Sequence, residues 1–434
     1  MSSPPLSIVF IVRDPLPPHR ADVLALFGTE MPRHGVVTEL VGQGGDGDTA
    51  SPWPAGGMHV VGSLRSRFAS VCSPLWDLLG LLRALRGGRP DCIQVRDKIA
   101  SGLLGRIAAA VLGVPFIYWM SFPIVEGFEV RRDDLRCELL HDLRLGRQHQ
   151  CRHRRSHGLP SLHQLRAALV WAGHALRARA SRWVIDRWVL PGARHIFVQS
   201  DAMADWLAAR GVERTRMTAV PMGVDAALFQ RAAVAPARDA RLDGRRVVIY
   251  LGRVARSRRS DFLLDVAEEL RRSMPEALLV IAGDAPSDDE MAWMRREIAT
   301  RGLEHHVLLT GWLPQRTALG YAVRAEVGLS PIPRGTLFDV SSPTKLVEYL
   351  ALGIPGVAND IPDQKLVIEQ SGAGLCVPME ARAFAAATVQ LLRDSDSAEQ
   401  YALRGPAYVK SHRTYDILAR NVAHTYKKIL TEQG

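Results

Sequence analysis

Short apolar runs alternate with segments of helical period along most of the chain. Ten runs stand out, at 7–12, 36–42, 92–95, 116–121 and 195–200, and then at 247–252, 277–283, 307–311, 327–330 and 356–359. Such short, nearly continuous apolar runs predict strands buried on both faces, as parallel sheets require. Helical patterns lie between them, for example at 261–274 and 343–353. The alternation predicts an α/β protein built from doubly wound parallel sheets.

The predicted strands fall into two sets. A polar stretch at 230–244 separates them and is the best candidate for a linker. At 434 residues the chain is also too long for one ordinary domain. We therefore expect two α/β domains of similar size that face each other across a ligand cleft. The predicted boundaries are 1–225, 226–410 and a final segment at 411–434.

One segment is long enough to resemble a membrane span. Residues 107–125 carry no charge, but Gly113, Pro115 and Pro123 interrupt them. The Gly-Val-Pro sequence is typical of a helix-to-strand connection. We therefore expect a helix end followed by a buried strand, in a soluble protein.

Charge and cysteine content narrow the class of protein. Lys and Arg number 55 against 45 Asp and Glu, which gives a net charge of +10. That excess favours an anionic partner: a nucleic acid, a membrane surface or a phosphorylated small molecule. The five cysteines are scattered without a C-x-x-C pair, so they support neither a disulfide framework nor a zinc site. This pattern fits a reducing cytoplasm.

A glycine-rich segment matches a nucleotide-binding fingerprint only superficially. Residues 42–47 satisfy G-x-G-x-x-G after a predicted strand, but the following 48–57 (DTASPWPAGG) does not open a helix. The fingerprint needs that helix N-terminus to hold a pyrophosphate. We interpret the segment as a flexible loop.

Two arginines follow the first predicted strand of the second set. Arg253 comes directly after Gly252, and Arg258 precedes the helix that begins near Asp261. Side chains leaving the carboxyl end of a parallel strand point into the ligand crevice, and a guanidinium can donate to two diphosphate oxygens at once. A solvated basic loop is the alternative, because Arg256 and Arg259 are also present.

A second candidate site lies at 338–360. Ser342 and Pro343 predict a helix start, with free amides at Thr344 and Lys345 that could bind an anion, and Gly353 predicts its end. Glu348 then falls on a mostly apolar face, where a ribose diol would satisfy its carboxylate. The alternative is an i, i+3 ion pair with Lys345.

From residue 194 onward the chain resembles the family-four glycosyltransferases. Five segments occur in the family's order, each similar to one of its motifs: 197–229 ("P-x-G-V-D-x-x-x-F"), 250–264 ("G-R-x-x-x-x-K-G"), 279–286 ("G-x-G-P"), 310–314 ("F-x-G") and 341–360 ("L-E-A-M-A-x-G-x-P-V-V-A"). The resemblance implies the GT-B fold, two Rossmann-like domains around a cleft, with acceptor binding in the first and nucleotide-sugar binding in the second. It also implies that the helix at 414–430 crosses back onto the first domain.

The resemblance assigns roles to residues of the second domain. Arg253 matches the family arginine and Arg258 the family lysine that hold the donor diphosphate, and Glu348 matches the ribose-binding glutamate. The loops at Gly283, Asp284, Trp312 and Leu313 would flank the phosphates and the base. The implied reaction is metal-independent sugar transfer with retention, and no cofactor is implied.

The chain also departs from the family pattern. The sugar-contacting glutamate would fall at Val340, where adjacent Asp339 could replace it only if the loop shifts. The family histidine would fall near Ser121, beside Phe122, and the N-terminal Gly-Gly loop is replaced by 14–20, beginning at Asp14. We expect Asp14, Ser121 and Phe122 to lie on the acceptor side.

Most of the excess charge belongs to one insert. Residues 131–190 contain 13 arginines, no lysine and five acids, an excess of eight positive charges. Within it, an apolar helical stripe is flanked by Arg and Trp and consists of Leu162, Leu165, Leu169, Ala172, Leu176 and Trp183. Such a helix suits an anionic membrane surface, with packing of the stripe on the domain core as the alternative. No nucleic-acid-binding motif accompanies the charge.

The favoured function is therefore a glycosyltransferase of polysaccharide or glycolipid biosynthesis. Its partners would be a nucleotide-sugar donor and a glycan or polyprenyl-diphosphate-linked acceptor at the cytoplasmic face of a membrane. Two alternatives stay open: a non-catalytic nucleotide-binding partner subunit, and a nucleotide-sugar epimerase on the same fold.

Overall fold

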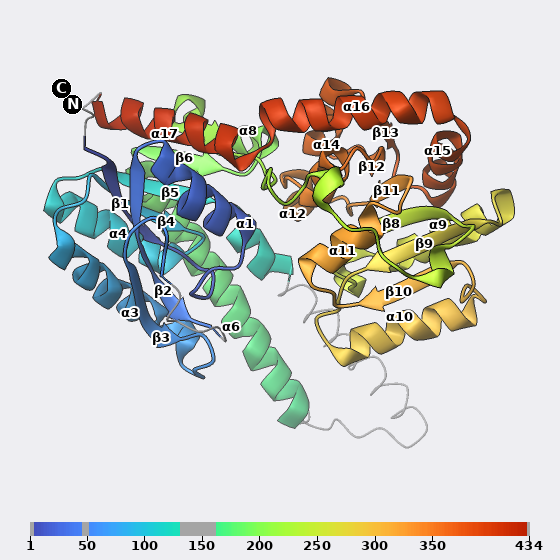
Figure 1. Ribbon diagram of the computed structural model, residues 1–434. Helices are drawn as coiled ribbons and strands as arrows, with labels where there is room; N and C mark the ends of the chain where they lie inside the picture. Colours follow the sequence, from blue (N-terminus) through green and yellow to red (C-terminus); the bar gives the residue numbers. More distant parts are fainter. Residues whose placement is uncertain (1–3, 46–51, 131–161, 432–434) are drawn as a thin grey trace, which may run out of the picture.

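Two parallel sheets, each covered by helices on both faces, form two domains side by side (Figure 1). The computed structural model describes residues 4–45, 52–130 and 162–431. The first sheet has the order β3-β2-β1-β4-β5-β6-β7 and the second the order β10-β9-β8-β11-β12-β13. The strands of the first sheet are β1 Leu6–Ile11, β2 Val36–Gly44, β3 Met58–Ser63, β4 Cys92–Arg96, β5 Phe116–Met120, β6 His195–Val198 and β7 Met217–Ala219. Those of the second are β8 Arg246–Leu251, β9 Ala277–Ala282, β10 Val307–Gly311, β11 Val327–Ser330, β12 Gly356–Asn359 and β13 Gly374–Val377.

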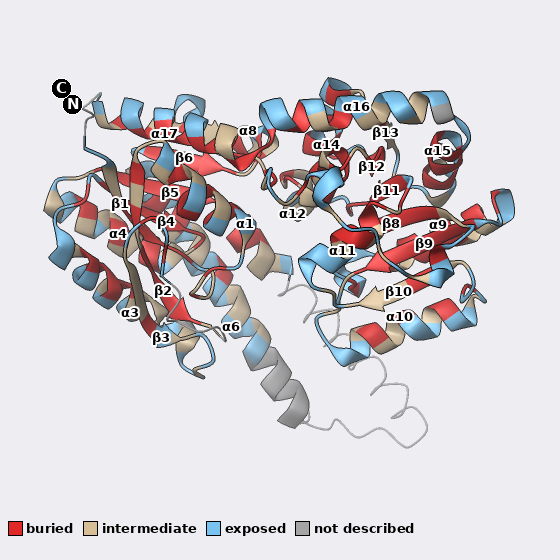
Figure 2. Ribbon diagram, in the orientation of Figure 1, coloured by how far each residue is buried: buried red, intermediate tan, exposed pale blue. Residues whose placement is uncertain are grey.

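All ten predicted strands are present, and three more were missed. The missed strands are β3, β7 and β13, and each is an edge strand. Edge strands are paired on one side only and are partly exposed, so they need no continuous apolar run. The alternation of strands and helices predicted the central strands because these are buried on both faces (Figure 2).

Helices fill both faces of each sheet. On the first sheet, one face is covered by α3 Ala69–Ala84, α4 Ile99–Leu112, α6 Leu162–Val184 with its continuation η3 Ile185–Val189 and α7 Leu190–Gly192, and α8 Asp201–Ala208. The other face is covered by α1 Ala21–Val23, η1 Leu24–Glu30, α2 Met31–Arg33 and α17 Tyr415–Thr431. On the second sheet, α9 Asp261–Ser273, α10 Asp288–Thr300 and α15 Ala381–Arg393 cover one face. The opposite side holds α11 Gln315–Ala322, α13 Thr344–Ala351, α14 Pro362–Ser371 and α16 Ser395–His412. The short helix α12 Thr336–Asp339 lies between β11 and α13 along the chain.

The chain crosses between the domains twice. It leaves the first sheet after β7 and returns between α16 and α17, where Val224 and Thr414 form a β-bridge. Arg413 at this crossing binds the Asp363 carboxylate at 2.8 Å, and both side chains are almost fully buried. Helix α17 then packs on the first sheet, with the Tyr426 ring 5.2 Å from that of Phe197. The last helix therefore belongs to the core of the first domain (Figure 1).

Two uncertain segments are settled by the fold. The uncharged stretch at 107–125 divides into the end of α4 and strand β5, with Gly113 in the left-handed conformation between them. Among the described residues, no helix is long and apolar enough to cross a membrane. The prediction of a flexible loop at 42–47 is wrong in part, because Gly42 to Gly44 are the buried end of β2; Asp46 and Gly47 lie outside the described residues.

Candidate active site

The carboxyl end of β8 carries the two predicted arginines. Gly252 and Arg253 follow the strand directly, and Arg258 ends a short 3-10 turn before α9. Both guanidiniums are exposed. They therefore stand at the edge where doubly wound sheets bind ligands.

The pairing of the neighbouring arginines argues against a merely solvated basic loop. Arg256 pairs with Glu290 at 3.5 Å, and Arg259 pairs with Asp261 at 3.4 Å. Within the described part of the chain, neither Arg253 nor Arg258 has a carboxylate partner. The two predicted side chains are thus the ones left free to bind an external anion.

Close backbone contact explains two glycines of this edge. A Cβ atom at Gly283 would lie 1.9 Å from the carbonyl oxygen of Gly252, which is less than van der Waals contact allows. Gly252 itself has φ +152°, a conformation that favours glycine. The loops after β8 and β9 can therefore approach each other only without side chains at these positions.

Helix α13 brings Lys345 and Glu348 to the same edge. The hydroxyl of Tyr349 accepts a hydrogen bond from the Leu251 N–H at 2.7 Å and donates to the Leu329 carbonyl at 3.2 Å. These two bonds attach the helix to the ends of β8 and β11. The Glu348 carboxylate is partly buried and has no hydrogen bond or ion pair among the described residues.

The predicted helix start is wrong by one residue. Pro343 is the N-cap, Thr344 begins the helix, and no side chain caps it. The Ser342 hydroxyl instead donates to the Asp363 carboxylate at 2.7 Å and accepts from the Met222 N–H at 2.9 Å. The Ser342 hydroxyl therefore makes its hydrogen bonds at the interdomain crossing. Its side chain is buried and does not face a nucleotide-sugar donor.

The alternative ion pair between Lys345 and Glu348 does not form. The Lys345 ammonium lies over the Tyr250 ring, 5.1 Å from its centre, and its side chain is buried. Burial, and then the positive charge of Arg258, lower the pKa of Lys345 to about 8, although Glu348 opposes this shift. Burial raises the pKa of Glu348 to about 7, with Lys345 opposing. The two groups share one electrostatic environment that an anionic, hydroxylated ligand would complete.

The position of the missing glutamate is occupied by an interdomain contact. Val340 is 5% exposed and packs into the apolar cluster of the first domain, and its carbonyl accepts a hydrogen bond from the Ser200 hydroxyl at 2.6 Å. Adjacent Asp339 is held by Arg334 at 2.8 Å. Asp339 therefore does not take the place of the glutamate in this conformation.

The remaining predicted donor residues lie on neighbouring loops. Asp284 is exposed after β9, and its carboxylate accepts from the Ala285 N–H at 2.9 Å. Trp312 is 69% exposed after β10, whereas Leu313 is half-buried against the core. An exposed Trp beside this edge is available to a flat ring such as a base.

On the facing domain, a buried ionic cluster occupies the predicted acceptor positions. Ser121 is buried, accepts a 3.2 Å hydrogen bond from Arg96, and binds the carboxylate of Asp97 through its N–H and hydroxyl groups. Asp14 lies 3.6 Å from Arg20 and 3.9 Å from Arg96. Asp97 takes the Ser121 hydroxyl in this conformation, and acceptor binding by Ser121 stays a prediction. Phe122 is 37% exposed and remains accessible.

Arg96 and Asp97 were not predicted as site residues. Arg96 is fully buried, contacts the carboxylate of Asp22, and leaves its Nε and Nη1 without hydrogen-bond partners. Burial raises the pKa of Asp97, whereas Arg96 and Arg20 lower that of Asp22 to about 2 against the effect of its burial. A signal was present in the sequence, because Arg96 ends β4 and Asp97 and Lys98 follow it directly.

Tyr415 connects this cluster with the donor edge. Burial, and then the charges of Asp22 and Glu348, raise the pKa of its hydroxyl. Its Oη has no hydrogen-bond partner in the described chain. The pKa of this hydroxyl therefore responds to one carboxylate of each domain, Asp22 of the first and Glu348 of the second.

In the described part of the basic insert, the apolar stripe does not pack on the domain core, which was the alternative to a membrane-facing helix. On α6, Leu176 is 71% and Trp183 61% exposed, and Ala172 is also exposed. Arg182 instead turns toward the domain and binds Glu126 and Glu129. The side chains of Leu162, Leu165 and Leu169, and the whole of 131–161, lie outside what the structure describes.

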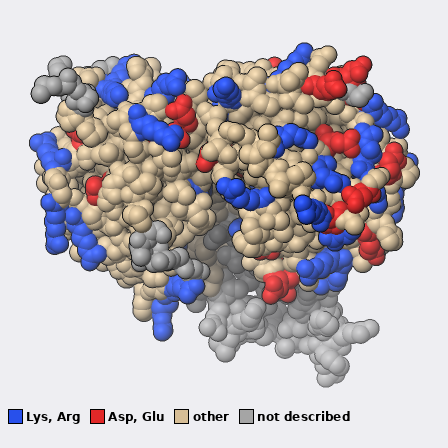
Figure 3. Space-filling view, in the orientation of Figure 1, with Lys and Arg blue, Asp and Glu red and all other residues tan. Residues whose placement is uncertain are grey.

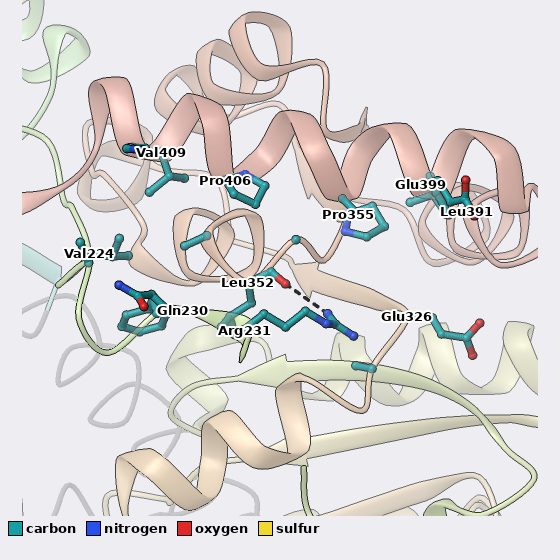
Figure 4. Close-up of a pocket in the computed structure, with 18 of the residues that line it drawn as sticks. Val224, Gln230, Arg231, Glu326, Leu352, Pro355, Leu391, Glu399, Pro406 and Val409 are labelled. Atoms are coloured by element: carbon teal, nitrogen blue, oxygen red, sulfur yellow. Dashed lines mark hydrogen bonds between the residues drawn. The ribbon is translucent and has the colours of Figure 1, made fainter. Parts of the chain in front are cut away.

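A large cavity of about 850 Å³ lies elsewhere, beneath α16 (Figure 4). Arg231 crosses it to the Leu352 carbonyl at 3.1 Å. Its wall includes Arg246, Glu326 and Pro355, which mark the amino ends of β8, β11 and β12. The cavity is therefore at the end of the sheet opposite to the candidate site.

Comparison with known proteins identifies both domains. A family model described as a glycosyl transferase 4-like domain matches residues 21–223, and one described as glycosyl transferases group 1 matches residues 245–394. The chain belongs to the GT-B glycosyltransferases of the family-four type. The sequence-based assignment of family and fold is confirmed.

Curated relatives are distant and partial. The α-D-kanosaminyltransferase of Streptomyces kanamyceticus is 26% identical over 43% of this chain and 47% of that protein. The phosphatidyl-myo-inositol mannosyltransferase of Mycolicibacterium smegmatis is 26% identical over 48% of this chain and 51% of that protein. The chain thus spans about half the length of the curated relatives it matches.

Solved GT-B structures match nearly the whole chain in fold. Anabaena Alr3699/HepE in complex with UDP has a TM-score of 0.64 and 15% identity, covering 98% of this chain and all of the other. Sucrose-phosphate synthase from Thermosynechococcus elongatus has a TM-score of 0.67 and 17% identity, covering 99% of this chain and all of the other. These likenesses establish the architecture.

Proposed function

We propose that this glycosyltransferase moves a sugar from a nucleotide-sugar donor to a glycan acceptor. One observation carries the proposal. At the carboxyl edge of the second sheet, Arg253 and Arg258 have no carboxylate partner among the residues that the structure describes, and beside them Lys345 and Glu348 have pKa values displaced toward neutrality. Perturbed, unpaired groups at a cleft are typical of a functional site. That Alr3699/HepE was solved with UDP supports a nucleoside diphosphate as the ligand.

In this proposal the protein acts mainly through electrostatics. Arg253 and Arg258 bind the diphosphate and stabilise the charge that develops on it as the sugar leaves. Glu348 accepts hydrogen bonds from the ribose hydroxyls, and Trp312 contacts the base. The reaction proceeds with retention at the anomeric carbon, with the donor phosphate as the base for the acceptor hydroxyl. Side-chain cations take the part that a metal plays in other transferases.

The acceptor is proposed to be linked to a lipid, such as a polyprenyl diphosphate. The outer face of α6 supports this, because Leu176 and Trp183 are exposed beside arginines. An apolar stripe with Arg and Trp suits the interface of an anionic membrane. The enzyme would then work in polysaccharide or glycolipid biosynthesis, peripherally on the cytoplasmic face.

A panel of nucleotide sugars tests the donor, and radiolabelled transfer tests the reaction. A ligand at 100 times its Kd adds about 2.7 kcal/mol of stability, so the correct nucleotide produces a clear rise in Tm. We expect one nucleotide class to stabilise the protein and its sugar to pass to lipid extracts with the donor's anomeric configuration. Absence of stabilisation by every nucleotide would contradict the proposal.

A second candidate is a non-catalytic partner subunit that binds nucleotide. The burial of Val340 between the domains favours it, because no acid faces the donor sugar at that position. The two candidates differ in one outcome. A partner subunit would bind the nucleotide but neither transfer nor hydrolyse the sugar, with or without membranes.

A further inference from the structure

A second cavity, of about 670 Å³, opens at the carboxyl edge of the first sheet. It lies between α3, α4 and the C-terminal half of α6, three of the helices that cover one face of that sheet. Arg13 follows β1 there, Gln43 is the next-to-last residue of β2, and Lys98 follows β4. The cavity is thus on the side of the sheet that faces the cleft, in the domain opposite the donor site.

The walls of this cavity are mostly apolar. Leu103 and Leu104 come from α4, Ile124 and Phe128 from the helical turn after β5, and Val184 from α6. Leu64 and Ala69 extend the wall to the start of α3. Beyond this point the outer face of α3 continues as a stripe of exposed residues, Phe68, Val71, Leu75, Leu79 and Leu82. An apolar path therefore leads from the cavity to the protein surface.

The floor of the cavity is polar and already satisfied. Asp77 is 1% exposed and accepts hydrogen bonds from Lys98 at 2.8 Å, from Gln43 at 2.7 Å and from Ser101 at 2.5 Å. The carboxylate of Asp77 consequently neutralises the charge of Lys98, whose side chain is largely buried. The floor closes the apolar space without offering an uncompensated charge.

Two arginines at the cavity supply that charge. Arg13 and Arg177 both line it, both are exposed, and neither has a carboxylate partner among the described residues. Arg177 is held in place by the Phe128 ring, with its guanidinium carbon 4.8 Å from the ring centre. Two free guanidiniums beside an apolar chamber complement a molecule that has a phosphate at one end of an apolar chain.

We propose that this cavity binds the lipid phosphate of the acceptor, with Arg13 and Arg177 on the phosphate and the isoprenoid chain between α4 and α6. This inference rests on the proposed function, since it names the part of the first domain that holds the acceptor. It commits to a lipid phosphate rather than a free phosphate, because the walls, and not the arginines alone, make the site.

Farnesyl phosphate, a short isoprenoid phosphate, is the probe in a calorimetric titration of the full chain. We expect one molecule to bind, and inorganic phosphate and farnesol each to bind at least tenfold more weakly. Ala180→Trp fills the cavity from α6 and should weaken farnesyl phosphate at least tenfold. Ala172→Trp, an exposed change on the same helix outside the cavity, should leave it unchanged.

Arg13→Gln with Arg177→Gln tests the head group. The double variant should lose most of its affinity for farnesyl phosphate and none for farnesol. Equal binding by Ala180→Trp and the unchanged protein, or inorganic phosphate binding as tightly as farnesyl phosphate, would overturn the inference. So would the absence of farnesyl phosphate binding.

Binding of nucleoside diphosphates, measured on the same preparations, separates the two proposals. If nucleotides stabilise the protein while farnesyl phosphate does not bind, the lipid site alone is wrong. If farnesyl phosphate binds as expected but no nucleotide does, the transferase proposal fails and the cavity assignment stands.

Discussion

The two domains share one architecture but differ in what their helices present to the outside. Of the eighteen large apolar side chains that are exposed in the described structure, fifteen lie before residue 190 and three in the second domain. The arginines do not divide in this way. In the first domain Arg182 binds carboxylates and Arg106 donates to a backbone carbonyl, and in the second Arg301 and Arg271 do the same.

The charge distribution follows this division. On the visible face, basic and acidic side chains intermingle over the second domain, while the first shows a broad uncharged area bordered by basic residues (Figure 3). In the proposed function, the exposed apolar residues of the first domain, with arginines such as Arg177 beside them, form a surface suited to lipid. In the proposed function, the same fold would therefore bind a soluble donor on one side and an amphipathic acceptor on the other.

The strongest test of this contrast is at the donor edge. Arg258→Ala should reduce kcat/KM for sugar transfer about 100-fold, the scale of losing one transition-state contact. Arg256→Ala is the matched control, since Arg256 already pairs with Glu290 and should leave transfer unchanged. Equal losses in both variants would mean that the loop acts only through its overall charge.

The next effect concerns the outer face of α3. Leu75→Asp should weaken binding to anionic vesicles about tenfold or more, because an exposed leucine that enters the interface contributes about 1.5–3 kcal/mol. Leu403→Asp is the control in the second domain, where Leu403 is 76% exposed on α16. Flotation with and without anionic lipid measures both. If the two variants float alike, the difference between the domains has no bearing on membranes.

A smaller effect is expected in stability. The pKa of Glu348 is raised from 4.5 to about 7, so its ionisation opposes folding as pH rises through this window. Glu348→Gln should therefore match the unchanged protein near pH 4.5 and exceed it by about 1 kcal/mol at pH 8, after a discount for partial exposure. Denaturant unfolding at the two pH values measures this. The same variant should transfer sugar at least tenfold more slowly, and higher stability without lower activity would remove Glu348 from the site.

The smallest expected effect is that of metal removal. Because side-chain cations stabilise the leaving diphosphate in the proposed mechanism, transfer in excess EDTA should equal transfer in Mg²⁺. A loss of activity in EDTA that Mg²⁺ restores would contradict this mechanism and would assign part of the diphosphate charge to a metal.

Local sequence predicted much of the fold because its signals are short-range. Buried central strands need continuous apolar runs. Loops between strands and helices contain helix-breaking residues, so the loop with Arg253 and Arg258 and the start of helix α13 could also be recognised. The edge strands β3, β7 and β13 were not, because exposure relaxes the apolar requirement.

What the sequence determined by itself was the family and the two α/β domains, and it predicted residues for the donor edge, since each of these depends on local motifs and local apolar patterns. The tertiary structure decided which of those residues are free. Ser342 and Ser121 looked available but are taken by Asp363 and Asp97, and Val340 is packed against the other domain. Partners for a polar or apolar group come from segments distant in sequence, and only folding brings them within bonding distance.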